Sequence, residues 1–212
     1  MSSPTVLDTL AQHRLVPVVV VDGAEQGLGL ADALIAGGLP VAEITLRTAG
    51  GLDAIRAVAA ERPDVVVGAG TVTTAAQVDD VVGAGARYIV SPGLSRAVVE
   101  RAQEHGVPVL PGVATATEVM TALDLGVETV KLFPASVVGG PAALKALAAP
   151  FPGLRFVPTG GVSADNLPDY LALKPVLAVG GSWMVAKGLV DAGDWAEITR
   201  RTTEAVDLTK ES

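Results

Sequence analysis

Eight short apolar segments recur along the chain, and a segment with helical periodicity follows each of them. The apolar segments are 15–21, 41–47, 64–71, 87–91, 108–113, 129–133, 155–159 and 176–181. The helical segments lie near 24–37, 51–61, 73–84, 95–105, 115–125, 140–149, 163–173 and 194–207, and a further helix is expected near 4–13. Such strict alternation predicts a parallel sheet, because parallel neighbours need a crossover connection that a helix usually supplies.

Two parallel architectures fit this alternation, an open doubly wound sheet and a closed barrel. A doubly wound sheet that binds a dinucleotide carries a GxGxxG turn directly after its first strand. Here Gly27 and Gly29 fall inside the first helical segment instead. The repeat of roughly 25 residues agrees with a compact barrel of eight strand-helix units. We therefore expect an α/β protein whose residues 1–212 form one (β/α)₈ TIM barrel domain with an extra N-terminal helix.

The composition excludes several kinds of site and partner. Hydrophobic residues make up 50% of the chain but aromatic residues only 3%, which suits aliphatic strands buried on both faces. There is no cysteine, and the two histidines, His13 and His105, lie at helix ends, so we expect no metal. The net charge of −8 argues against nucleic acid as a partner. No leader or membrane-spanning pattern is visible, which favours a cytoplasmic protein.

Lys131 is the one lysine that falls inside an expected strand, between Val130 and Leu132. A barrel strand is covered on both faces, so the amine has to point into the mouth of the barrel or stay buried. Loss of water favours the neutral amine, which is the form that attacks a carbonyl carbon. A structural lysine that is paired with a buried carboxylate is the alternative.

Glu43 is the one acidic residue inside an expected strand, in the segment Glu-Ile-Thr-Leu-Arg at 43–47. Alternation with a period of two sends Glu43, Thr45 and Arg47 to one face of the strand, and the apolar residues between them to the other. The polar face then points into the barrel. Glu43 is a candidate acid and base, and Arg47 a candidate clamp for a substrate carboxylate, because a guanidinium grips two oxygens. A structural ion pair between Glu43 and Arg47 is the alternative.

Two glycine pairs end the last two expected strands, in Thr159-Gly160-Gly161 and in Gly180-Gly181-Ser182. Barrels often bind phosphate after these strands, and glycine lets backbone amides approach an anion closely. We therefore expect a phosphate site built from Thr159, Gly160, Gly161, Gly181 and Ser182. Thr71 and Pro92, which follow the third and fourth strands, are expected to complete the rim.

Several motifs occur in the order in which one enzyme family carries them. They are Val-Pro-Val-Val-Val-Val at 16–21, Ala-Glu-Ile-Thr-Leu-Arg-Thr at 42–48, Val-Gly-Ala-Gly-Thr-Val at 67–72, Ser-Pro-Gly at 91–93, Leu-Pro-Gly-Val at 110–113, Lys-Leu-Phe-Pro-Ala at 131–135, Pro-Thr-Gly-Gly-Val at 158–162 and Gly-Gly-Ser-Trp at 180–183. From about residue 14 to residue 207, the chain resembles the bacterial 2-dehydro-3-deoxy-phosphogluconate (KDPG) and 4-hydroxy-2-oxoglutarate aldolases. One departure is Ser136, where members often carry glutamate.

The resemblance implies a class I aldolase that needs no cofactor and works as a homotrimer. Lys131 would form an imine with the substrate, and Glu43 would move protons. The resemblance also assigns Arg47 and Thr71 to the carboxylate of pyruvate and places Phe133 beside the imine. The phosphate of the substrate would lie at Gly160, Gly161, Gly181 and Ser182.

The expected reaction is cleavage of KDPG to pyruvate and glyceraldehyde 3-phosphate. Three alternatives stay open at this point. The same chemistry could serve the galactonate epimer or 4-hydroxy-2-oxoglutarate. A phosphate-binding barrel isomerase or decarboxylase would not need a lysine in a strand, and a catalytically silent barrel would release no pyruvate.

Overall fold

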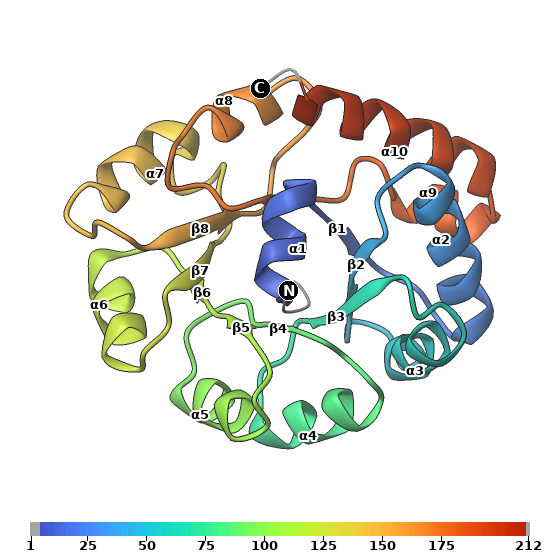
Figure 1. Ribbon diagram of the computed structural model, residues 1–212, viewed down its shortest axis with the longest axis horizontal. Coiled ribbons are helices and arrows are strands. Elements are labelled where there is room, and N and C mark those ends of the chain that lie inside the picture. The colour runs from blue at the N-terminus through green and yellow to red at the C-terminus, as the bar shows by residue number, and fades with distance from the viewer. Residues whose placement is uncertain (1–4, 211–212) are drawn as a thin grey trace.

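The computed structural model describes residues 5–210, which form a ring of parallel strands surrounded by helices (Figure 1). The strands are β1 (Leu15–Val19), β2 (Val41–Thr45), β3 (Val66–Gly70), β4 (Ile89–Val90), β5 (Val109–Leu110), β6 (Gly112–Val113), β7 (Thr129–Leu132), β8 (Arg155–Pro158) and β9 (Val179–Gly181). The helices are α1 (Val6–His13), α2 (Ala24–Ala36), α3 (Gly51–Glu61), α4 (Ala75–Gly83), α5 (Arg96–Glu104), α6 (Ala116–Asp124), α7 (Gly140–Ala148), α8 (Leu167–Leu171), α9 (Lys187–Ala192) and α10 (Trp195–Lys210).

The strands close into a barrel through two sheets and the bridges between them. One sheet has the order β5-β4-β3-β2-β1-β9, and the other has the order β6-β7-β8. Residue pairs Phe156–Val176 and Thr159–Gly180 bridge β8 to the segment that contains β9. At the other junction, β5 and β6 are two halves of one strand of the ring. The expected (β/α)₈ barrel is thereby confirmed.

Pro111 divides the fifth strand, which the sequence predicted as one segment over 108–113. Proline has no N–H to continue a ladder. Leu110 pairs with β4, whereas Gly112 pairs with Lys131 on β7. The carbonyl of Pro111 still accepts a hydrogen bond from the N–H of Lys131, at 2.9 Å, so the strand changes partners without leaving the barrel.

Two helices near the end of the chain differ from the prediction. The helix expected over 163–173 is reduced to α8, because the side chain of Asn166 accepts the N–H of Ser163 and holds the preceding residues in a turn. The additional helix α9 was not predicted; it begins at Lys187 and ends at Ala192, and the next residue, Gly193, has a φ of 64°. Residue 4, the first of the expected N-terminal helix, lies outside the described residues.

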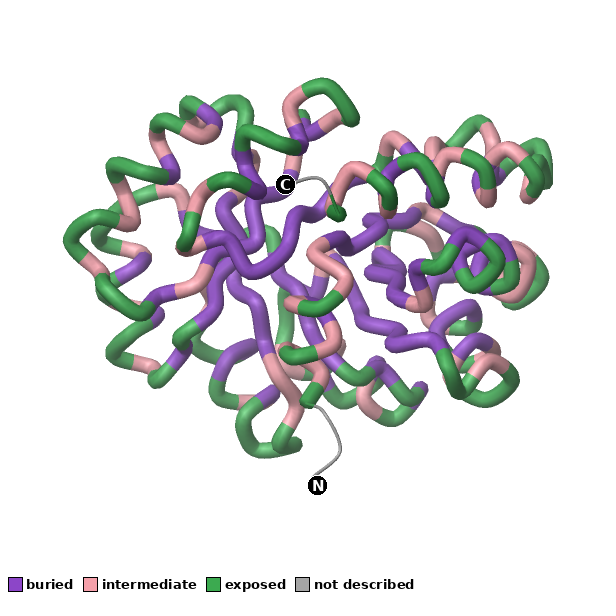
Figure 2. Tube along the Cα trace, turned by 45° about the horizontal axis from the view of Figure 1, so that its top comes forward, coloured by how far each residue is buried: buried purple, intermediate pink, exposed green. Residues whose placement is uncertain are grey.

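The interior is built from aliphatic side chains, and every residue of β1, β2 and β3 is buried (Figure 2). Helix α1 lies across one end of the barrel, in the centre of Figure 1. It directly precedes β1, so this is the end where the strands begin. Most of the expected substrate-binding residues lie at the opposite end, in the segments that follow the strands, whereas Lys131, Glu43 and Gly181 lie on strands. Between residues 5 and 210, no helix is long and apolar enough to cross a membrane.

Candidate active site

Lys131 and Glu43 form a buried ion pair inside the barrel. Lys131 lies on β7 and Glu43 on β2, and the lysine Nζ donates to the glutamate Oε1 at 3.1 Å. The side chains are 5% and 3% exposed, respectively. Lys131 Nζ also lies 5.2 Å from the centroid of the Phe133 ring. A proton donor and acceptor so close, with little water, can exchange a proton directly, which would leave a neutral amine on the lysine.

The two glycines of β3 create the space for this arrangement. Glu43 extends across Gly70, and a Cβ atom at that position would overlap its Oε1 atom. Two residues earlier on the same face, a Cβ atom on Gly68 would overlap the ring of Tyr88. In the sequence Gly-Ala-Gly-Thr at 68–71, the two glycines therefore allow close packing inside the barrel, and Thr71 lies at its rim.

Tyr88 is completely buried, and its hydroxyl has no hydrogen-bond partner within the described part of the chain. Burial, together with the negative charge of Glu43, holds the pKa of Tyr88 well above its usual value. The hydroxyl therefore stays protonated and neutral near the carboxylate.

Arg47 does not pair with Glu43, so the structural ion pair considered from the sequence is absent. Its Nε instead donates to the Oγ1 of Thr71 at 3.3 Å. Thr71 has a φ of 63°, a left-handed conformation that is costly for a β-branched residue. The Thr71 hydroxyl accepts the bond from Arg47 in this strained conformation, and strain of this kind concentrates at functional sites.

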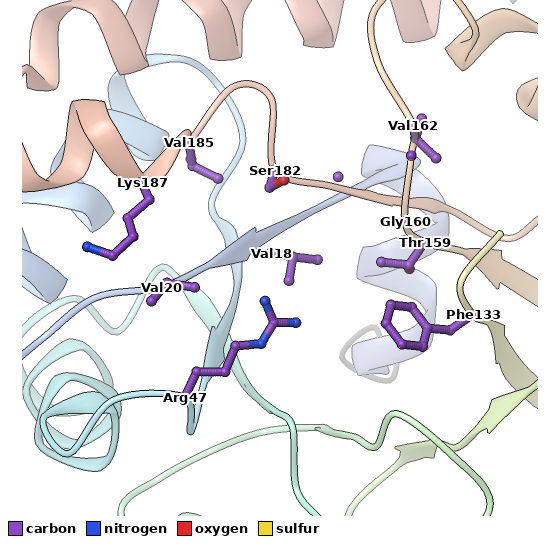
Figure 3. A pocket seen from close by; sticks show the side chains of 12 residues that line it. Val18, Val20, Arg47, Phe133, Thr159, Gly160, Val162, Ser182, Val185 and Lys187 are labelled. Atoms are coloured by element: carbon purple, nitrogen blue, oxygen red, sulfur yellow. The ribbon is translucent and has the colours of Figure 1, made fainter. Parts of the chain in front are cut away.

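A cavity of about 390 Å³ opens where the strands end (Figure 3). Most of the predicted substrate-binding residues line it: Arg47, Phe133, Thr159, Gly160, Gly161, Gly181 and Ser182. In Figure 3 the guanidinium of Arg47 points into the cavity from the loop after β2. The buried side chains of Lys131 and Glu43 do not line the cavity. Phe133 does line it, and its ring packs next to the Nζ atom of Lys131.

Pro92 lies apart from this cavity. It borders a separate hollow together with Val72, Ser91 and Ser95. Its carbonyl fills the position that a side chain on Gly112 would take. The structure therefore brings Pro92 to the same end of the barrel but not into the cavity.

The glycine pairs at the ends of β8 and β9 leave backbone groups available for an anion. Gly160 and Gly161 have φ angles of 99° and 75°, where other residues are strained. Among residues 5–210, no acceptor takes the backbone N–H of Gly161 or of Ser182. Amides that face a cavity in this way are a common means of holding phosphate.

Lys187 also lines the cavity, although it falls outside every strand and helix expected from the sequence. The sequence signal that could have identified it is its position shortly after Gly-Gly-Ser at the end of the last strand. Because α9 was not predicted, the residue could not be placed on a defined element. The described residues contain no group of three or more His, Asp or Glu side chains that could hold a metal ion.

Comparison with known proteins identifies the family. A family model described as KDPG and KHG aldolase matches residues 6–201. The 2-dehydro-3-deoxy-phosphogluconate aldolase of Pseudomonas aeruginosa is 50% identical over 202 residues, which cover 95% of this chain and 92% of the relative.

Two solved structures show how closely the fold agrees. The KDPG aldolase of Legionella pneumophila, with pyruvate captured at low pH as a covalent carbinolamine, is 41% identical with a TM-score of 0.90, covering 93% of this chain and 96% of that chain. The aldolase of Zymomonas mobilis with 3-phosphoglycerate is 42% identical with a TM-score of 0.88, covering 94% of each chain. This chain therefore belongs to the KDPG and KHG aldolase family and is a class I aldolase, a carbon-carbon lyase.

Proposed function

We propose that this protein cleaves 2-dehydro-3-deoxy-6-phosphogluconate to pyruvate and glyceraldehyde 3-phosphate, with Lys131 as the nucleophile and Glu43 as the acid and base. The observation that carries the proposal is the buried pair in which Lys131 Nζ lies 3.1 Å from Glu43 Oε1. A relative of this chain holds pyruvate as a covalent carbinolamine, the intermediate that such a lysine would form.

The reaction begins with proton transfer inside the pair. Glu43 takes a proton from Lys131, and the neutral amine attacks the C2 ketone of the substrate. The Arg47 guanidinium, oriented by Thr71, holds the carboxylate at C1. Glu43 returns its proton to the departing hydroxyl, so that the carbinolamine loses water and becomes an iminium ion.

The iminium ion makes the cleavage possible because it accepts an electron pair. Glu43 removes the proton of the C4 hydroxyl, the C3–C4 bond breaks, and its electrons form an enamine on Lys131. Glyceraldehyde 3-phosphate leaves. Glu43 then protonates C3 of the enamine, and hydrolysis of the resulting iminium frees pyruvate and the lysine.

The phosphate at C6 would bind at the other side of the cavity, at Thr159, Gly160, Gly161, Gly181 and Ser182. The free N–H groups of Gly161 and Ser182 support this placement. Pro92 would shape the rim rather than contact the substrate directly, since it borders a different hollow.

A second substrate has support of its own, because the matching family model covers both KDPG and KHG aldolases. The unphosphorylated 4-hydroxy-2-oxoglutarate and the galactonate epimer of KDPG use the same steps at Lys131. We expect kcat/KM to be highest for KDPG, because its phosphate supplies binding energy that orients the reacting carbons. Equal kcat/KM values for the phosphorylated and unphosphorylated substrates would contradict the proposed role of phosphate binding.

Reduction with borohydride in the presence of pyruvate tests the nucleophile. We expect one covalent adduct per chain, and peptide mapping should place it on Lys131. Lys131→Ala should keep its fold and lose turnover by several orders of magnitude, because the electron sink is gone.

Lys145 and Lys174, both exposed, serve as internal controls in the same peptide map. Reduction without pyruvate should modify no lysine. An adduct on either control lysine, or no adduct at all, would exclude the Schiff-base mechanism at Lys131.

We also propose that the protein is a homotrimer in the cytoplasm, in keeping with its resemblance to the family. A designed protein cage built by fusing symmetric oligomeric domains contains a chain that is 30% identical to this one, with a TM-score of 0.82. Light scattering should give three times the chain mass of 21.3 kDa. A mass of one chain would contradict the proposed assembly.

A further inference from the structure

The cavity is lined by two cationic side chains, Arg47 and Lys187, and by no acidic one. They lie on different sides of it: Arg47 comes from the loop after β2, and Lys187 is the first residue of α9 (Figure 3). In this view Val20 lies between them, and Ser182 and Val185 lie above. A substrate with a carboxylate at one end and a phosphate at the other would meet one cation at each end.

The ammonium of Lys187 pairs with a carboxylate on its own helix and not with a group in the cavity wall. Its Nζ contacts both carboxylate oxygens of Asp191, one turn further along α9, at 2.6 Å and 2.5 Å. In Figure 3 the ammonium points away from Ser182. Both side chains are well exposed, at 61% for Lys187 and 50% for Asp191.

We propose that Lys187 is a specificity-determining residue that leaves Asp191 to bind the phosphate of the substrate. This inference rests on the proposed function, because it assigns a further residue to the same substrate. The new element is a pair of charged side chains on α9, Lys187 and Asp191, which lie outside the two glycine pairs.

The exchange of partners is physically reasonable because the resting pair is weak. Exposed ion pairs at a spacing of four residues contribute little, since water screens them and two long side chains lose freedom. A phosphate ester offers more charge and three strong acceptor oxygens, and backbone amides already hold it in place. Lysine has a flexible four-carbon stem, so Nζ can move without a change in α9.

Two substitutions on α9 should change phosphate recognition in opposite directions. Lys187→Gln removes the cation, and we expect kcat/KM for KDPG to fall roughly fivefold to tenfold relative to 4-hydroxy-2-oxoglutarate. Asp191→Asn releases the cation, and the same ratio should rise about twofold. The readout is the ratio for the two substrates, measured with each purified variant at low ionic strength.

Lys187→Arg is the conservative control and should keep most of the ratio. The effect of Lys187→Gln should shrink as salt is added, because the cation is exposed and screened. Inorganic phosphate should inhibit turnover of 4-hydroxy-2-oxoglutarate, and Lys187→Gln should weaken that inhibition.

The opposite signs separate recognition from a structural role. If the pair only stabilised α9, both Lys187→Gln and Asp191→Asn would lower activity on the two substrates equally, and the inference would be wrong. An unchanged ratio in both variants would overturn it as well. If the wild-type enzyme prefers KDPG but neither variant alters the ratio, only the inference about Lys187 is wrong. If the wild-type enzyme shows no preference for KDPG, the proposed phosphate site itself is contradicted.

Discussion

Two side chains, those of Glu43 and Tyr88, fit inside the barrel because the residues of β3 that they pack against are glycines. Gly70 leaves room for the carboxylate of Glu43, and Gly68 leaves room for the ring of Tyr88. Both groups therefore lie over the same face of β3, two residues apart, which corresponds to roughly 7 Å along a strand. The negative charge of Glu43 and the unpaired hydroxyl of Tyr88 are thus near each other in an environment with little water.

Tyr88→Phe should make the protein more stable. A buried hydroxyl without a partner costs free energy, so we expect the free energy of unfolding in urea at pH 7 to rise by about 1 kcal/mol. A second effect should appear in alkali. The pKa of Tyr88 is raised in the folded state, so its neutral form contributes fully below the ordinary pKa of 10.0, and stability is lost as the pH rises above it.

The variant should lose less stability than wild type in that alkaline range. Some loss should remain, because burial also raises the pKa of Tyr170. A variant that is less stable than wild type at pH 7 would show that the hydroxyl has a favourable partner, such as an ordered water molecule.

The two residues of the buried pair stand out in the sequence, whereas their surroundings could not be predicted. Lys131 and Glu43 stand out because a charged side chain on a strand that is buried on both faces must point into the barrel. Lys187 gives no such signal, since an exposed lysine in a short helix looks like many others. The contact between Arg47 and Thr71 depends on a backbone angle of Thr71 that no pattern of residue types reveals.

The structure also changes how the phosphate site should be tested. If the backbone of Gly181 approaches a bound phosphate, replacing Gly181 with valine would crowd the anion. In the structure, however, a Cβ atom on Gly181 would overlap the ring of Trp183. Loss of activity in that variant would therefore report packing as well as phosphate binding, and the exposed Lys187 offers a cleaner probe.

At the scale of helices, the first and last units of the barrel meet through a glycine. Gly29 on α2 faces Trp195 at the start of α10, and a Cβ atom there would lie 2.6 Å from the indole ring. Thr199 on α10 adds a hydrogen bond to the carbonyl of Ala33 on α2. Gly29, which falls inside the first helical segment of the sequence, is therefore a packing position between two helices.

Gly29→Ala should destabilise the protein although alanine is the better helix former. The added methyl group would force the indole to move, and we expect a loss of about 1 to 3 kcal/mol in urea unfolding. Gly83→Ala at the end of α4 is the matched control, because no atom lies within 4 Å of the added methyl group. There the helix preference should give a gain of about 0.5 to 1 kcal/mol. Equal effects in the two variants would contradict the role of close packing at Gly29.

Short elements were the hardest to predict at this scale. The periodicity of α3 was long enough to give its bounds, Gly51–Glu61, directly. Helix α9 has only six residues and follows a turn, so its pattern is too short to recognise. The division of one strand at Pro111 depends on which neighbour each half pairs with, and this is decided only when the barrel closes.

In the molecule as a whole, the proposed mechanism depends on one covalent bond between the substrate and Lys131. In that mechanism the iminium ion would serve as electron sink and Glu43 would move the protons, so the proposed steps need no Lewis acid. Among residues 5–210, no three His, Asp or Glu side chains gather as metal ligands. His105, the residue that caps the C-terminus of α5, pairs with Asp79, and its Nε2 lies 2.6 Å from Oδ1.

Prolonged treatment with EDTA, followed by its removal, should therefore leave kcat and KM for KDPG unchanged. The assay should follow release of pyruvate, and the metal content should be measured before and after treatment. Borohydride trapping with pyruvate gives a second readout, because the adduct on Lys131 should form equally well in treated and untreated enzyme. A loss of turnover that zinc restores, with trapping unaffected, would show that a metal acts after imine formation and would contradict the proposed division of work between Lys131 and Glu43. A loss of both readouts that metal does not restore would instead indicate damage to the barrel.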